Sequence, residues 1–189
     1  MHKPLHILVI EDNPADFLLL ERHLKQQGLA AECLSAAGMD ELQAALDRGK
    51  WDIVLADYKV PGLNFPDILR ITDTRVPGVP VILVSGTVGE EEAIELLKQG
   101  VWDFVLKSNL ARLVPAIERC LRDAEERRAR RTAEKRLNSF FRGATAGLAM
   151  LDRDLRYIQI NDTLAQMNGL CAEEHLGRTV REVLPELIP

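Results

Sequence analysis

The chain has 189 residues, of which 47% are hydrophobic, so it can hold one large domain or one domain with a further segment. Its three cysteines are odd in number and form no C-x-x-C pair, which argues against a disulfide or zinc framework and favours a reducing compartment. No stretch has the apolar length of a signal peptide core or a membrane span, so we expect a cytoplasmic protein whose chain does not cross a membrane.

The net charge of −5 is unevenly distributed. Residues 1–110 carry 10 Lys/Arg and 17 Asp/Glu, residues 111–136 carry 9 and 5, and residues 137–189 carry 5 and 7. The acidic first part is typical of a cation-binding domain. The basic middle part could contact nucleic acid, but the acids mixed through it favour a solvated or coiled-coil helix, and we expect no direct nucleic acid binding.

The first apolar run, residues 5–10, ends on the acid pair Glu11-Asp12. Asn13-Pro14 then opens a helix, which Gly28 closes. A weak strand over residues 31–35 and a helix from Asp40 to Gly49 follow. The first third of the chain therefore reads as strand, helix, strand, helix.

The central stretch, residues 53–56, is entirely apolar and ends on Asp57, before the turn residues Pro61-Gly62. A short run of this kind is typical of a strand that is buried on both faces of a parallel sheet. Ligands bind at the carboxyl edge of such sheets, which makes Asp57 a candidate for chemistry. On this stretch alone, an aspartate that only starts the turn is an equal interpretation.

The remaining elements continue the alternation. A helix is expected over residues 65–71, a strand over residues 81–85, a helix over residues 90–98 and a strand over residues 102–106, before a long helix that starts near Leu110. Five strands alternating with five helices predict an α/β fold, a doubly wound five-stranded parallel sheet with right-handed crossovers.

Four predicted strands end on polar side chains, and parallel strands bring these ends to one sheet edge. The residues are Glu11 and Asp12, then Asp57, Ser85 and Lys107. Three converging carboxylates need a compensating cation, and hard oxygen ligands suit Mg²⁺, which often shares its shell with phosphate. Asp57 could act as a nucleophile that forms an aspartyl phosphate, while Ser85 and Lys107 contact the phosphoryl oxygens.

Together these residues resemble the receiver domain of two-component response regulators, a flavodoxin-like fold. The resemblance covers about residues 4–124. It implies that Asp57 accepts a phosphoryl group from a histidine kinase or a phosphotransfer protein, in a self-catalysed reaction without enzymatic turnover. It also implies roles for the surrounding residues: Mg²⁺ ligation by Glu11, Asp12, Asp57 and the Lys59 carbonyl, phosphate binding by Gly86 and Lys107, and a hydroxyl–aromatic switch formed by Ser85 and Phe104.

Two features depart from the family pattern. Ser108-Asn109 follows Lys107 where many receivers have proline, so we expect an altered turn before the last helix. Lys59 and Thr87 resemble the positions that flank the route of hydrolytic water.

Two alternatives remain. A phosphohydrolase of the haloacid-dehalogenase type also uses a strand-end aspartate and Mg²⁺, but it has a second aspartate where this chain has Lys59. The second alternative is a receiver-like module that binds partners without being phosphorylated.

The long helix turns polar after Leu121, and residues 125–138 read as a helical linker. A faint 3,4 repeat runs through Ile117, Cys120 or Leu121, Ala124, Arg128 and Arg131. It is too polar for a strong coiled coil, so a parallel homodimer through this helix is one hypothesis. Residues 139–189 resemble the first part of an α+β PAS sensor domain, with strands over residues 147–152 and 157–161 and a tight turn between them. Two strands do not make an independent sheet core, so we expect this partial PAS-like segment to be loose or held by a partner, with a kinase or other output domain left open beyond Pro189.

Overall fold

The computed structural model describes residues 3–86, 95–96 and 98–185. The chain forms two compact units, Met1–Arg128 and Ala129–Pro189. In the described residues, no helix combines the length and apolar content that crossing a membrane requires. The predicted helix over residues 90–98 falls largely outside the described residues.

The first unit contains a five-stranded parallel sheet with strand order β2-β1-β3-β4-β5. The strands are β1 (Leu5–Ile10), β2 (Ala31–Ala36), β3 (Ile53–Ala56), β4 (Val81–Ser85) and β5 (Asp103–Leu106). The helices are α1 (Pro14–Gln26), α2 (Met39–Arg48) and α3 (Phe65–Arg75), followed after β5 by the 3₁₀ helix η1 (Lys107–Arg112) and by α5 (Leu113–Gly143). This is the predicted doubly wound α/β architecture.

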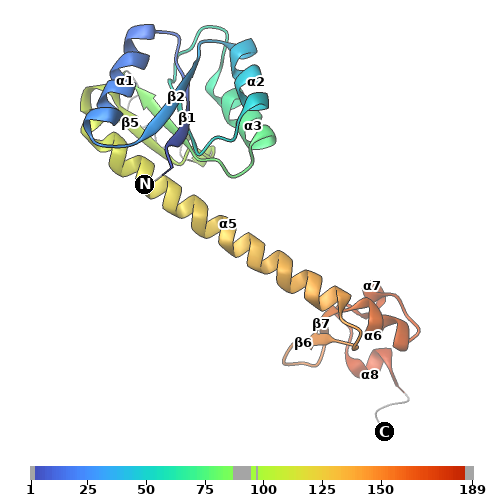
Figure 1. Cartoon of the computed structure of the whole chain (residues 1–189). Coiled ribbons are helices and arrows are strands. Elements are labelled where there is room, and N and C mark those ends of the chain that lie inside the picture. The colour runs from blue at the N-terminus through green and yellow to red at the C-terminus, as the bar shows by residue number, and fades with distance from the viewer. Residues whose placement is uncertain (1–2, 87–94, 97, 186–189) are drawn as a thin grey trace. The chain divides into compact units, whose positions relative to one another are not determined.

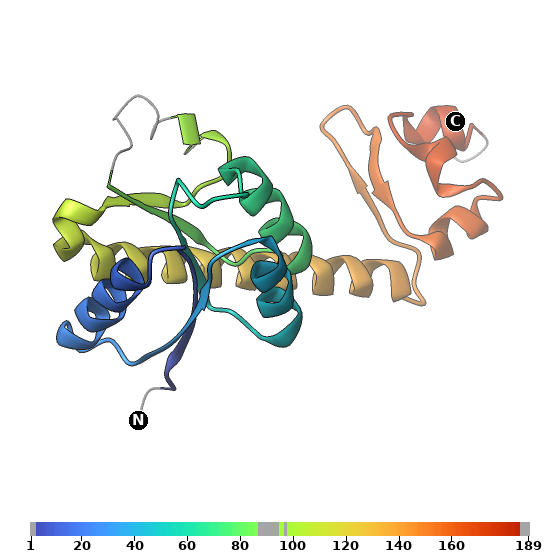
Figure 2. The same ribbon diagram turned by 90° about the horizontal axis from the view of Figure 1, so that it is seen from above.

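Each face of the sheet is covered by different helices. The first turns of α5 pack with α1 on one face, through Leu20, Leu24 and Ile117. On the other face, α2 and α3 lie side by side and bury Leu42 and Ile68 (Figures 1 and 2). The central strands β3 and β4 are therefore buried on both sides, which is why residues 53–56 and 81–84 are continuously apolar instead of alternating.

The sequence places the start of the last helix only approximately. The chain leaves β5 through η1, and Asn109, inside η1, adopts φ −137° and ψ 61°, a non-helical conformation that kinks this segment. The α-helix begins at Leu113, three residues after the predicted start. Ser108 and Asn109 both lie in η1. The difference expected from receivers with proline at this point stays a prediction.

Helix α5 is fastened to β5 by polar contacts as well as by its apolar face. The Arg119 guanidinium forms an ion pair with Asp103, the first residue of β5. The Arg127 guanidinium carbon lies 4.3 Å from the ring centroid of Trp102, the residue before that strand. The helix is therefore attached to the strand that leads into Lys107.

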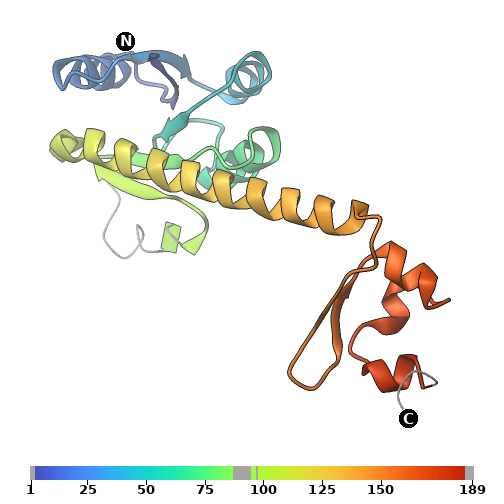
Figure 3. The ribbon, with the colours of Figure 1, turned by 60° about the horizontal axis from the view of Figure 1, so that its bottom comes forward.

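The second unit contains the end of α5, the antiparallel strands β6 (Ala149–Leu151) and β7 (Tyr157–Ile160), and the short helices α6 (Asp162–Met167), α7 (Ala172–His175) and α8 (Val180–Val183) (Figure 3). Tyr157, Ile160, Ala165 and Val183 form a small buried core. Asn161 is fully buried beside it. A hydrophobic cluster therefore joins the hairpin to the helices.

Candidate functional site

The carboxyl ends of β1, β3 and β5 deliver Glu11, Asp57 and Lys107 to the same point. The Lys107 Nζ lies 2.6 Å from Glu11 Oε2 and 2.9 Å from Asp57 Oδ2. It also lies 2.6 Å from Asp16 Oδ2, in the first turn of α1. One ammonium thus donates hydrogen bonds to three carboxylates.

Glu11 is the most buried of these acids, with a side chain that is 2% exposed. Burial raises the pKa of its carboxyl group above the ordinary value, although the hydrogen bonds from Lys107 and from the Asn13 amide act in the opposite direction. The ionised form of Glu11 therefore depends on the cation beside it.

The Lys107 side chain is 15% exposed. Burial opposes its charged form, but the hydrogen bonds to Asp16, Glu11 and Asp57 outweigh burial and raise the pKa of the ammonium group. Lys107 is consequently a fixed positive charge throughout the physiological pH range.

Asp57 follows β3, and its side chain is 13% exposed. Its backbone amide donates to Ile10 O, which ties the end of β3 to β1. Its two carboxylate oxygens differ in their surroundings: Oδ1 accepts a hydrogen bond of 2.6 Å from the Tyr58 amide, and Oδ2 accepts the one from Lys107. The carboxylate is therefore held in one orientation at the sheet edge, where part of it is exposed to solvent.

The other predicted site residues lie in the same part of the fold. Ser85 is the last residue of β4 and is buried, and Gly86 follows it and is exposed. Phe104 lies in β5, is half-buried and packs against the hydrophobic cluster under α2 and α3. The predicted switch pair thus comes from adjacent strands, which pair Ser85 with Leu106 and Leu83 with Phe104.

Asp12 and Lys59 are exposed, and each adjoins a strand end in this region. Thr87 lies outside the described residues. The metal ligation predicted for Asp12 and for the Lys59 carbonyl stays a prediction.

Asp16 was not identified from the sequence. Asp16 lies in the first turn of α1, and Asp12 precedes that helix, so no helical spacing links the two acids in the sequence. Because acids are common in the first turn of helices, an aspartate at this position does not by itself indicate a contact with Lys107.

The carboxylates suit a hard cation such as Mg²⁺, which binds one or two carboxylates and keeps several waters. Among the described residues, no three His, Cys, Asp or Glu side chains are spaced to hold a metal ion as they stand. The ammonium of Lys107 draws three of the carboxylates to itself. A bound cation would therefore take Glu11 and Asp57 oxygens from Lys107.

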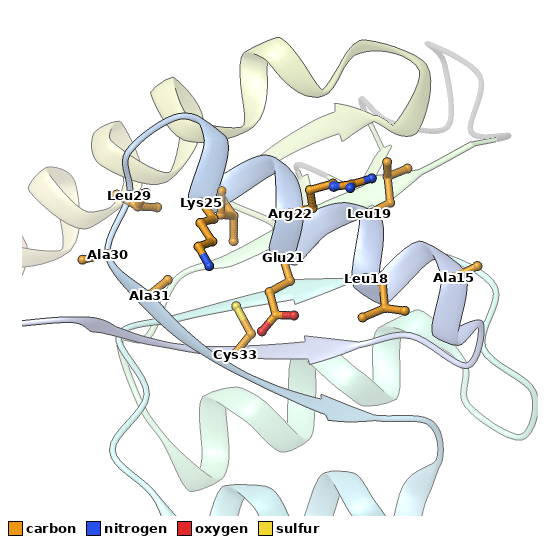
Figure 4. A pocket seen from close by; sticks show the side chains of 11 residues that line it. Ala15, Leu18, Leu19, Glu21, Arg22, Lys25, Leu29, Ala30, Ala31 and Cys33 are labelled. Atoms are coloured by element: carbon orange, nitrogen blue, oxygen red, sulfur yellow. The ribbon is translucent and has the colours of Figure 1, made fainter.

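A separate groove of about 960 Å³ lies between α1 and the edge strand β2 (Figure 4). Leu18 and Leu19 line it with Glu21, Arg22 and Cys33. Burial and the charge of Glu21 raise the pKa of the Cys33 thiol to about 11, so this thiol is not an activated nucleophile. None of the clustered acids lines the groove, which is therefore separate from the candidate site around Asp57.

The chain is similar to known proteins in sequence and in fold. A sequence profile of the response regulator receiver domain matches residues 7–118, and a profile of the PAS fold matches residues 141–188. The transcriptional regulatory protein GlrR of Escherichia coli is 27% identical over 169 residues, which make up 89% of this chain and 36% of GlrR. The chain thus spans about a third of the length of that relative.

Two solved structures resemble the first unit. A receiver domain from Clostridium thermocellum is 27% identical with a TM-score of 0.57, covering 64% of this chain and 97% of that one. The receiver domain of NtrX from Brucella abortus is 28% identical with a TM-score of 0.55, covering 61% and 98%. Since the receiver profile spans more than half of the chain and the sheet has the matching topology, the chain belongs to the response regulator receiver family of two-component signalling, and a PAS region follows its receiver domain.

Proposed function

We propose that Asp57 accepts a phosphoryl group from a phosphohistidine of a histidine kinase or phosphotransfer protein, and that this state controls the region that follows. The observation that carries the proposal is the contact between Lys107 Nζ and Asp57 Oδ2 at 2.9 Å, beside the buried carboxylate of Glu11. It brings a candidate nucleophile and a candidate phosphate-binding cation to the same sheet edge.

The reaction makes one bond and breaks one. An Asp57 carboxylate oxygen attacks phosphorus, the phosphorus–nitrogen bond to the donor imidazole breaks, and the electron pair of that bond returns to the imidazole. Lys107 and the Ser85 hydroxyl bind the phosphoryl oxygens, and the Gly86 backbone leaves room for them. Glu11, Asp12, Asp57 and the Lys59 carbonyl are the residues that would hold Mg²⁺, which supplies charge neutralisation on the phosphoryl oxygens.

Incubation with Mg²⁺ and acetyl phosphate, followed by intact mass measurement, tests this function. We expect the wild type to gain the mass of one phosphoryl group and Asp57→Ala to gain none, because acetyl phosphate needs no docking partner. Asp73→Ala, which changes an exposed acid of α3, is the matched control and keeps the adduct. Rapid release of many phosphates per chain would instead indicate a phosphohydrolase of the haloacid-dehalogenase type, and a wild type without an adduct would indicate a module that works without phosphorylation.

Helix α5 is the element through which we propose that the signal leaves the receiver. Its ion pair with Asp103 and the stacking of Arg127 on Trp102 attach it to β5, the strand that carries Phe104 and ends before Lys107. A rearrangement of Ser85 and Phe104 on phosphorylation would therefore act on the strand to which α5 is fixed. The PAS region is the proposed recipient.

The three cysteines are all free thiols, which supports a cytoplasmic location.

The homodimer predicted through α5 needs a different seam from the one that the sequence suggested. Ile117, Cys120 and Ala124 are buried in the receiver core and cannot meet a second helix. Every residue from 125 to 140 is exposed, and an apolar stripe with spacings of four, four and three runs along this part. It consists of Ala129, Ala133, Leu137 and Phe140. Since Leu137 is 71% and Phe140 72% exposed, we propose that a second copy of the chain covers this stripe.

Sedimentation tests the dimer. We expect the full chain to sediment as a dimer and the chain cut after residue 124 as a monomer. Leu137→Glu should shift the full chain to monomer, because it places a charge in the apolar seam. Lys135→Glu is the control, since residue 135 points to the opposite side of the helix. Identical masses for the full and shortened chains, or a Leu137→Glu dimer, would refute the proposal.

A further inference from the structure

The Lys107 ammonium has one more carboxylate partner than the proposed phosphorylation site accounts for. Glu11 and Asp57 are proposed metal ligands, whereas Asp16 is outside that set. Nevertheless, the Asp16 contact is as short as the contact to Glu11, at 2.6 Å. Asp16 reaches Lys107 from α1, across 91 residues of sequence, so this contact is tertiary.

A cation at this edge competes with Lys107 for the same oxygens. Mg²⁺ needs oxygens of Glu11 and Asp57, and both residues have an oxygen that is bonded to the ammonium. The ammonium and the metal ion also repel each other when they share a carboxylate. Without a third partner, Lys107 has two outcomes. It keeps the Glu11 and Asp57 oxygens and excludes the metal ion, or it loses its hydrogen bonds although its side chain is only 15% exposed to water.

We propose that Asp16 is a positioning residue that holds the Lys107 ammonium while Glu11 and Asp57 turn to Mg²⁺. This inference rests on the proposed function, because it assumes the Mg²⁺ site. The Asp16 side chain is 32% exposed, so it can keep a charged partner at the rim without being a metal ligand itself. Lys107 then remains close to Asp57, where an arriving phosphoryl group needs it.

Asp16→Asn is expected to weaken Mg²⁺ binding through two different effects, and the experiment must separate them. The loss of a negative charge weakens Mg²⁺ binding from any distance, whereas the loss of the lysine's partner weakens it only while Lys107 is present. A double-mutant cycle with Lys107→Met, which keeps the apolar stem and removes the charge, distinguishes the two effects.

The experiment is a titration of the isotope-labelled full chain with MgCl₂, followed through the NMR signal of the Tyr58 amide, which donates to Asp57 Oδ1. We expect Asp16→Asn to raise the apparent Kd for Mg²⁺ about tenfold in the wild-type background and less than about twofold in the Lys107→Met background. Asp16→Glu, which keeps the carboxylate, should recover at least half of the loss. Asp40→Asn, which removes an exposed first-turn acid of α2, should leave the Kd unchanged.

Equal losses in the two backgrounds would overturn the inference, since they would show a general charge effect. An unchanged Kd in Asp16→Asn would also overturn it. If Lys107→Met does not fold, the comparison of Asp16→Asn with Asp16→Glu decides, and failure of the glutamate to recover binding counts against the proposal. A wild type that binds no Mg²⁺ would instead overturn the proposed function, and with it this inference.

Discussion

Lys107→Met is expected to lower the free energy of unfolding in metal-free buffer by about 3 kcal/mol, because it removes one partner of a buried ion cluster. The side chains of Glu11 and Asp57 are only 2% and 13% exposed, and the substitution leaves both carboxylates close together without the ammonium. Urea denaturation at pH 7.5 measures the change. The matched control is Lys98→Met, which breaks a contact of 2.7 Å to Glu95 between side chains that are 67% and 64% exposed. Such a surface pair contributes at most about 1 kcal/mol.

The stability deficit of Lys107→Met should depend on pH with a definite sign. Burial already raises the pKa of Glu11, and removal of Lys107 takes away a hydrogen bond that lowers it. A carboxyl group whose folded-state pKa is raised binds its proton more tightly in the folded state, so stability falls as pH rises from the unfolded value through the folded one. We therefore expect a larger deficit at pH 8 than at pH 5. A small deficit that is equal at both values would contradict the ion cluster as a source of stability.

The positions of the site residues were predictable because each follows an apolar run. Residues 53–56 are continuously apolar, so the strand and its end at Asp57 can be located without a structure. The same holds for Glu11 after β1 and for Lys107 after β5. Parallel topology then brings these ends together, and the observed contacts of Lys107 follow this expectation. What remains a prediction is the chemistry assigned to them.

Other features escaped the sequence for physical reasons. Asp16 reaches Lys107 through a side-chain rotamer and the direction of α1, and neither is encoded in residue spacing. The first part of the repeat on α5 could not be assigned from sequence, because helical spacing alone cannot tell whether Ile117 and Cys120 face the parent sheet or a second chain. Ile117 and Cys120 are buried against the sheet, whereas the apolar side chains of Leu137 and Phe140 are exposed.

A single buried amide connects several segments of the second unit. Asn161 is 0% exposed and caps α6 through its Oδ1, which accepts hydrogen bonds from Leu164 N at 3.0 Å and from Leu148 N at 2.9 Å. Its Nδ2 donates to Phe141 O at 3.1 Å and to Ala146 O at 2.9 Å. One side chain therefore joins the end of α5, the segment before β6 and the start of α6.

Asn161→Ala is expected to destabilise this unit by at least about 3 kcal/mol, because it leaves several partly buried amides and carbonyls without partners at about 1–3 kcal/mol each. The core of the unit is small, so we expect the hairpin to open while the receiver stays folded. Hydrogen exchange of the amides in β7 (Tyr157–Ile160) and in β3 (Ile53–Ala56) measures both units in one sample. Exchange should become much faster in β7 and stay unchanged in β3. Asn138→Ala is the control, because the position is exposed and the Asn138 side chain has, among the described residues, one side-chain hydrogen bond, of 3.4 Å from Gln159. Equal protection of β7 in the two variants would show that the Asn161 network does not hold the unit together.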